Sequence, residues 1–151
     1  MELDKEKLKN FDKLPPDVRR QFSLLMNRYA EKKKQSKIKK DFMAFVKHVW
    51  PDFIEGKHHK EVAQKFNEIA DGKIKRVIIN MAPRHTKSEF ASYLLPAWMV
   101  GRNPKLKIIQ STNTTELSVR FGRKAKALMD SPEYKEVFKT RLKEDSQAAG
   151  K

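Results

Sequence analysis

Apolar residues recur at helical spacing through the first half of the chain and predict three helices. The first starts at Pro15–Pro16–Asp17, because proline is tolerated in the first helical turn. A second, over residues 39–50, stops at Trp50 because the residue before a proline is pushed out of the helical region. A third covers residues 58–70 and ends at Asp71–Gly72, in the manner of a glycine C-cap. The apolar residues that define the three helices are Val18, Phe22, Leu25, Met26 and Tyr29 in one stripe; Phe42, Phe45, Val46 and Val49 on one face; and Val62, Phe66 and Ile69.

The pattern changes in "KIKRVIIN", residues 73–80, where β-branched residues follow one another without alternation. Such a run is typical of a strand covered on both faces in a parallel sheet. "PKLKIIQST" (104–112) predicts a second buried strand, and between the two we expect a helix from about Lys87, kinked near Pro96 and finished by Gly101. This order predicts an α/β fold with a parallel sheet.

Two further helices are expected after the second strand. "NTTE" (113–116) has the spacing of a capping box, and Leu117, Phe121 and Leu128 mark the inner side of the helix that follows. Ser131–Pro132–Glu133 starts a short last helix. The domain organisation expected is a basic, mostly helical arm over residues 1–40 and the N-terminal portion of an α/β domain over residues 41–151.

The charge adds an expectation about partners. The 151 residues carry 34 Lys and Arg against 19 Asp and Glu, a net charge of +15, and such a field attracts nucleic acid or a partner with an acidic face. "EKKKQSKIKK" (31–40) is more typical of a solvated linker or helix end than of a dedicated DNA-binding segment. The sequence has no cysteine, no apolar run long enough to span a bilayer and no signal-peptide core, so we expect a soluble, intracellular protein.

"NMAPRHTKSEF", residues 80–90, places Lys87 and Ser88 where a phosphate-binding loop has its phosphate-contacting lysine and its Mg²⁺-binding hydroxyl. Met81 and Thr86 replace the two glycines of G-x-x-x-x-G-K-[ST]. Because glycine serves left-handed backbone angles there, we expect Met81 and Thr86 to send the loop along a different path. The motif alone is a weak signal, since Lys–Ser pairs are common in basic proteins.

Together with "LLPAWMVGRNPKLKII" and "FGRKAKALMDSPEYKEVF", the loop makes residues 41–150 resemble the N-terminal ATPase region of the large terminase subunits of tailed bacteriophages. That family carries a deviant Walker A sequence, Pro-Pro-Arg-His-Gly-Lys-Ser, after an apolar strand; Thr86 departs from its glycine. The resemblance implies a three-layer P-loop NTPase-like fold, incomplete here, and a function in ATP-driven translocation of viral double-stranded DNA into the capsid. ATP and Mg²⁺ would be the cofactors. The portal protein, the small terminase subunit and a homo-oligomeric ring would be the partners, in the host cytoplasm and without a membrane.

The resemblance also implies roles for individual residues. Lys87 would bind the β- and γ-phosphates, Ser88 would hold Mg²⁺, and Arg84 would act catalytically on the γ-phosphate. The remaining nucleotide-binding positions are Pro83, His85 and Thr86. Trp50, His58 and His59 fall where the family contacts adenine, although Trp50 also suits a core position and the histidine pair a surface one. Zinc binding by His48, His58, His59 and His85 is not expected, since neighbouring histidines should point apart.

In the helix after the second strand, four cations are candidates for DNA or subunit contact, with a solvated face as the alternative. They are Arg120, Arg123, Lys124 and Lys126.

A Walker B strand, apolar and ending in Asp, is absent from the sequence, as is the acidic cluster of a nuclease. The chain is therefore expected to correspond to the front part of a motor domain, to bind nucleotide without cleaving it, and to be marginally stable. The alternative reading is a non-enzymatic basic DNA-binding or interaction module from a truncated terminase gene.

Overall fold

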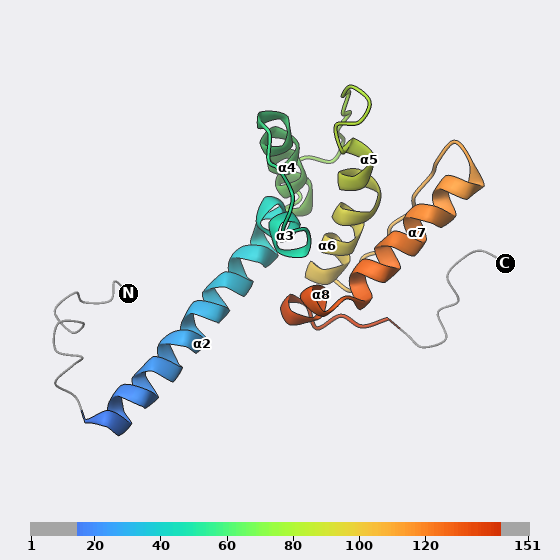
Figure 1. Ribbon diagram of the computed structural model, residues 1–151. Coiled ribbons are helices and arrows are strands. Elements are labelled where there is room, and N and C mark those ends of the chain that lie inside the picture. The colour runs from blue at the N-terminus through green and yellow to red at the C-terminus, as the bar shows by residue number, and fades with distance from the viewer. Residues whose placement is uncertain (1–14, 143–151) are drawn as a thin grey trace. The chain divides into compact units, whose positions relative to one another are not determined.

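A computed structural model describes residues 15–142 of the chain, and all regular structure in this range is helical (Figure 1). The chain divides into two compact units, Met1–Ser36 and Lys37–Lys151, with the division inside the first described helix. In chain order the elements are α2 (Pro16–Lys40), α3 (Phe42–Val49), α4 (Lys57–Ala70), α5 (Lys87–Glu89), the π-helical turn η2 (Phe90–Leu94), α6 (Leu95–Arg102), α7 (Thr115–Asp130) and α8 (Pro132–Val137).

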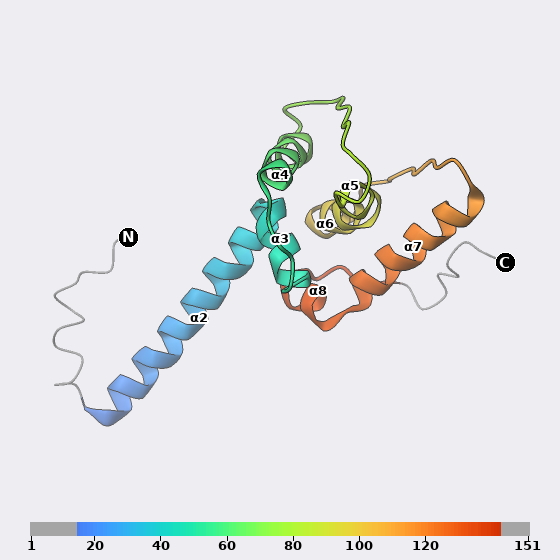
Figure 2. The same cartoon turned by 45° about the horizontal axis from the view of Figure 1, so that its top comes forward.

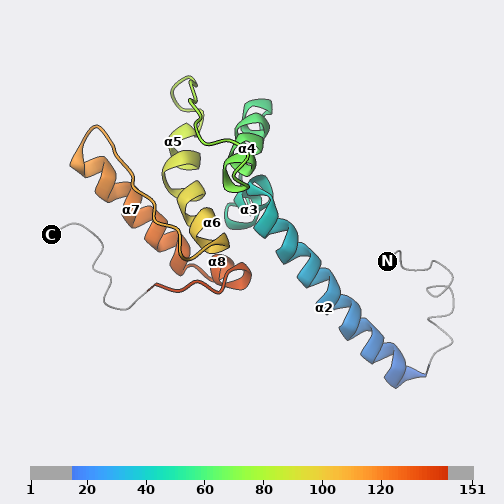
Figure 3. The ribbon, with the colours of Figure 1, turned by 180° about the vertical axis from the view of Figure 1, so that it is seen from behind.

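The expected α/β fold with a parallel sheet is wrong for the described residues. Residues 74–80 and 104–112, the two predicted strands, run between helices without forming any ladder in this part of the chain. The β-branched residues make the backbone extended, but a strand also needs a neighbour that pairs with its N–H and C=O groups. No such neighbour lies beside either segment between residues 15 and 142, and Figure 3 shows neither drawn as an arrow.

In the first unit, α2 carries the predicted apolar stripe of residues 18–29, and Leu25 is 63% exposed. The lysine-rich stretch 31–40 continues the same helix to Lys40, so it forms a helix end and not an irregular linker.

The second unit is built around aromatic side chains from α3, α4, η2, α6 and α8. Phe42 is fully buried and meets the rings of Phe66, Phe90 and Trp98 edge-on, with centroids 5.1, 5.4 and 5.5 Å away. Such edge-to-face contacts stabilise beyond the apolar area that they bury. The polar atoms in this core are satisfied: Trp98 Nε1–H donates to the Ile38 carbonyl at 3.0 Å, and the Tyr134 hydroxyl donates to the Ala97 carbonyl at 2.9 Å.

The helical run formed by α5, η2 and α6 lies between the α3–α4 pair on one side and α7 on the other (Figures 1 and 2). Pro96, near the start of α6, has no N–H to donate to the preceding turn. The adjoining turn, η2, is widened to the π form, which corresponds to the kink expected near Pro96. Phe90 and Leu94 of this turn are buried in the core.

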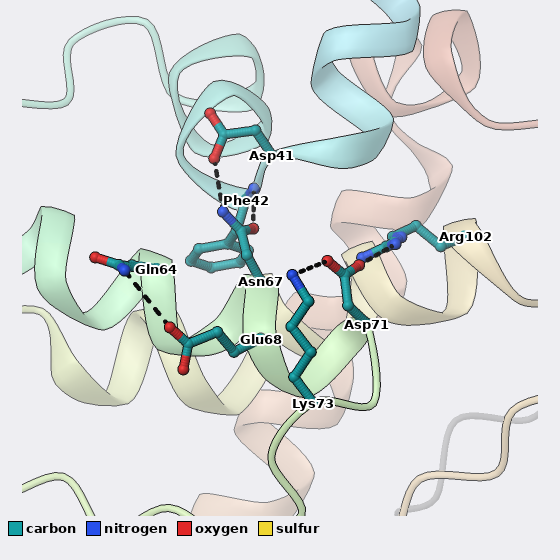
Figure 4. Close-up of polar contacts among 8 residues, drawn as sticks. All are labelled: Asp41, Phe42, Gln64, Asn67, Glu68, Asp71, Lys73 and Arg102. Atoms are coloured by element: carbon teal, nitrogen blue, oxygen red, sulfur yellow. Dashed lines mark hydrogen bonds and ion pairs between the residues drawn. The ribbon is translucent and has the colours of Figure 1, made fainter.

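Polar side chains join α3 to α4 at the start of α3 (Figure 4). Asp41 is the N-cap and accepts from the Ala44 N–H at 3.1 Å. Asn67 in α4 accepts the Phe42 N–H at 2.8 Å and donates to Asp41 at 2.9 Å, so one amide satisfies both the backbone and the cap. At the end of α4, Gly72 has φ 74°, as expected for a left-handed C-cap.

Candidate phosphate-binding loop

Residues 81–86 connect the first extended segment to the helical run 87–102, and most of their side chains face solvent. The helix begins with Lys87, and the first backbone bond of the run joins the Phe90 N–H to the Thr86 carbonyl at 2.9 Å. The backbone N–H groups of Thr86, Lys87 and Ser88 donate to no acceptor within the described part of the chain. Three donors at the positive end of a helix therefore remain available.

Thr86 adopts the backbone conformation that glycine would have in such a loop. Its φ is 56° and its ψ is 8°, and Arg84, two residues earlier, has φ 65°. The expectation that Thr86 diverts the loop from the left-handed path is thus wrong. Met81, at the position of the other replaced glycine, does not adopt a positive φ. A left-handed L-residue costs about 1–2 kcal/mol, and the β-branched Thr86 is a genuine outlier.

The Thr86 side chain explains how this conformation is held. Its hydroxyl donates to the His85 carbonyl at 2.7 Å and lies 2.7 Å from His59 Nε2. The Gly56 N–H donates to His59 Nδ1 at 2.9 Å, so the proton of the neutral imidazole is assigned to Nε2, which donates to Thr86. His59 therefore fixes the loop to the start of α4.

His59 is only 7% exposed and packs between two aromatic rings, with centroid distances of 4.8 Å to Phe53 and 5.3 Å to Phe90. Burial lowers the pKa of His59 below its ordinary value, and the neighbouring His58 and His85 lower it further. Both causes disfavour the imidazolium, so the neutral form that bonds Thr86 is the stable one.

The other two histidines lie on the same side of the loop. The His58 ring centroid is 3.8 Å from that of His59 and 5.3 Å from that of His85, so the neighbouring pair does not point apart as expected. His85 Nδ1–H donates to the Pro83 carbonyl at 2.9 Å. Within residues 15–142 no three His, Cys, Asp or Glu side chains are grouped in a way that could hold a metal ion.

Lys87 reaches back across the loop, where its Nζ donates to the Met81 carbonyl at 2.8 Å. This contact pairs the ammonium with a neutral carbonyl, and between residues 15 and 142 no carboxylate lies within ion-pair distance of it. Arg84 and Ser88 are exposed beside it. The loop thus presents two cations, a hydroxyl and three backbone donors on one short segment, which is the chemistry that a phosphate group requires.

Of the three residues expected to contact adenine, the structure brings His58 and His59 to the loop but not Trp50. Trp50 packs against Phe53 with the rings tilted by 52° and the centroids 5.3 Å apart, and it belongs to the edge of the aromatic core. Phe53 in turn touches His59, so Trp50 is linked to the loop only through the core.

The four basic candidates on α7 have different surroundings. Arg120 and Arg123 are exposed, and Lys126 is partly buried. Lys124 donates to both carboxylate oxygens of Glu89 at 2.9 Å and lies 5.2 Å over the Tyr93 ring, so it fastens α7 to the start of the helical run.

Sequence reasoning missed Glu89 and Tyr93 beside the loop. Burial raises the pKa of Tyr93 to about 12, and its hydrogen bond to the Glu89 carboxylate adds to the effect. No local pattern predicts the ion pair between Glu89 and Lys124, because the two residues lie 35 positions apart in the sequence.

Comparison of the chain with models of protein families, with curated proteins and with solved structures gave no match. None of the described helices is long and apolar enough to cross a membrane.

Proposed function

We propose that loop 81–88 binds the phosphate groups of a nucleoside triphosphate, and that the chain serves as the nucleotide-binding segment of a DNA-packaging ATPase of the large-terminase kind. One observation carries the proposal. Thr86 takes the left-handed conformation directly before a helix, and the N–H groups of Thr86, Lys87 and Ser88 are left without acceptors in the described chain. A succession of left- and right-handed residues turns such N–H groups toward one point and makes an anion-binding concavity.

The side chains of the loop fit ATP with Mg²⁺. Lys87 would exchange its contact with the Met81 carbonyl for the β- and γ-phosphates, which are stronger, charged acceptors. Ser88 would supply a hydroxyl ligand to Mg²⁺, and Arg84 would approach the γ-phosphate. Pro83 and His85 shape the loop through the bond between His85 Nδ1–H and the Pro83 carbonyl. Bound Mg²⁺ would neutralise phosphate charge.

His58 and His59 would lie on the side of the loop where a nucleoside could extend. His58 is partly exposed beside a hollow that also contacts Val77, Ile79 and Met81. An imidazole beside an apolar wall suits a base, which needs a stacking surface and a polar edge. Double-stranded DNA would contact the exposed Arg120 and Arg123 of α7.

Calorimetric titration with ATP and Mg²⁺ tests the proposal. Lys87→Ala should weaken binding by at least about tenfold, or 1.4 kcal/mol, because a charged contact to phosphate is lost. Lys139→Ala is the matched control: it removes the same charge from an exposed position and should leave the affinity within about twofold. Inorganic triphosphate in place of ATP separates phosphate recognition from base recognition.

Equal losses in the two lysine variants would contradict a built site and indicate general attraction of anions by the +15 charge. No ATP binding together with unchanged DNA binding, measured by fluorescence anisotropy at several salt concentrations, would favour the basic interaction module.

A further inference from the structure

The two extended segments share a surface pattern that the loop does not use. In each, a cation and an isoleucine two residues apart face outward. These are Arg76 and Ile78 in the first segment and Lys107 and Ile109 in the second. Ile78 is 88% exposed and Ile109 97% exposed. Exposed isoleucines repeated in the same register on two segments are unusual for a face that meets only water.

The residues that alternate with these isoleucines are less exposed: Val77 is 38% and Ile108 40% exposed, against 88% for Ile78 and 97% for Ile109. Ile79 packs against the aromatic core, and Leu106 is partly buried. Each segment is therefore half-covered already and has the period of two that a strand requires. The inward face fixes the direction in which Ile78 and Ile109 point.

Beyond Ile74 and Leu106, whose N–H groups donate to the Glu68 and Asn103 carbonyls, the segment backbones lack partners among the described residues. Within the described chain, the N–H groups of residues 75–80 and 107–111 donate to no backbone carbonyl. The side-chain nitrogen of Gln110 is buried and has no acceptor there. A row of free N–H and C=O groups is a template for another strand, and a buried amide without a partner calls for a missing neighbour.

The positive charge of the two segments indicates what kind of polypeptide could pair with them. Lys75, Arg76, Lys105 and Lys107 have no carboxylate within ion-pair distance among residues 15–142. A second copy of this chain would bring cation against cation at these positions, on a molecule that already carries +15. Like charges placed opposite each other destabilise a strand pair, whereas opposite charges stabilise it.

We propose that residues 75–80 and 107–111 bind an extended, acidic and apolar segment of another polypeptide, which adds to them as a β-strand. Its backbone pairs with the free N–H and C=O groups. Its apolar side chains lie beside Ile78 or Ile109, and its carboxylates lie beside Arg76 or Lys107. This surface contains none of the loop side chains Arg84, Lys87 and Ser88, although Val77, Ile78, Ile79 and Asn80 of the first segment also line the hollow beside His58.

The test uses a fluorescent synthetic peptide in which every second residue is threonine. The positions between the threonines are alternately glutamate and valine, so one face of the extended peptide carries both charged and apolar side chains. Two control peptides replace its glutamates with lysines or its threonines with prolines, which remove the ladder donors. Anisotropy should show binding of the first peptide and at least about tenfold weaker binding of both controls.

On the protein, Ile78→Ser and Ile109→Ser should each weaken binding severalfold without unfolding the chain, because both side chains are exposed. Ile54→Ser is the matched control, since Ile54 is 88% exposed but lies outside both segments, and it should bind like the wild type.

Equal binding of the lysine peptide, or equal effects of Ile54→Ser and Ile78→Ser, would overturn the proposal. So would absence of binding to the glutamate peptide. Sedimentation of the protein alone gives a further outcome: self-association abolished by Ile109→Ser would overturn it in favour of a second copy.

Discussion

Phe42 and Ile109 are both large apolar residues in stretches that the sequence predicts to be buried, but Phe42 is fully buried and Ile109 is 97% exposed. The two regions differ in how their backbones are satisfied. A helix pairs its N–H and C=O groups internally and needs only side-chain contacts from its neighbours. An extended segment needs another backbone beside it. Helices α3, α4, α6 and α8 therefore complete a core within the described residues, whereas segments 74–80 and 104–112 do not complete a sheet.

Removing the centre of the aromatic core should have the largest effect. Phe42→Ala should lower the free energy of unfolding by about 3–5 kcal/mol, because it leaves a cavity among three rings that contact it edge-on. Urea unfolding followed by circular dichroism measures the change. A loss below about 1 kcal/mol would mean that the core is loosely packed and that marginal stability, expected from the sequence, already applies to the wild type.

Removing the hydrogen bonds of Asn67, which connect α4 to the start of α3, should have the second largest effect on stability. Asn67→Ala removes the acceptor of the Phe42 N–H and the donor to Asp41 and should cost about 1–3 kcal/mol in the same assay. Gln64→Ala, one turn earlier on α4, removes only an exposed 3.5 Å contact to Glu68 and should change stability by less than about 0.5 kcal/mol (Figure 4). Similar losses in both variants would show that Asn67 has no special role.

The helices were predictable because their signals are local. Pro51 and Pro132 mark boundaries through their restricted backbones and Gly72 through its freedom to take a positive φ, and Thr114 caps α7 by accepting from the Leu117 N–H three residues later. Strand pairing was not predictable in the same way. The run Val77–Ile79 predicts an extended backbone, but the strand that pairs with an extended segment is determined by residues far away in sequence.

At the candidate site, the sequence indicated the loop and its Lys87–Ser88 pair but not the geometry around Thr86. The contact between His59 and Thr86 joins positions 27 residues apart. Propensity disfavours threonine in the left-handed region, and here the tertiary bond from His59, together with the helical bond from the Phe90 N–H, outweighs that preference. The phosphate role of the loop remains a prediction.

Substitutions at Thr86 separate the cost of its backbone from the contribution of its hydroxyl. Thr86→Gly removes the left-handed cost of about 1–2 kcal/mol and loses hydroxyl bonds worth about 0.5–1.5 kcal/mol, so stability should change little. Thr86→Val keeps the cost and loses the bonds, and should be less stable than Thr86→Gly by about 1–2 kcal/mol. Urea unfolding of the pair measures the difference. Equal stability would contradict a strained left-handed residue at this position.

Acid should loosen the contact between α4 and the loop. Because burial lowers the pKa of His59 below 6.5, the folded chain binds a proton there less readily than the unfolded chain. The contribution of His59 is present above pH 6.5 and is lost as the pH falls through the lowered pKa. His58 and His85 oppose its protonation, and Glu55 favours it.

Stability measured from pH 7 to pH 5 should therefore fall more steeply for the wild type than for His59→Gln, which retains an amide donor for Thr86 but does not titrate. Parallel pH profiles for the two proteins would show that other groups cause the acid sensitivity.

Substitution of Ile78 should have the smallest effect on stability, and comparison with its neighbour Ile79 should show which face of the first extended segment is covered. Ile78→Ser should change the free energy of unfolding by less than about 0.5 kcal/mol, because the side chain is 88% exposed in the folded chain. Ile79→Ser should cost about 1–2 kcal/mol, because Ile79 packs against the aromatic core. Hydropathy and β-propensity are the same at both positions, so any difference comes from which face is covered. Equal costs would mean that the segment has no fixed inward face and that Ile78 is not held outward for a partner.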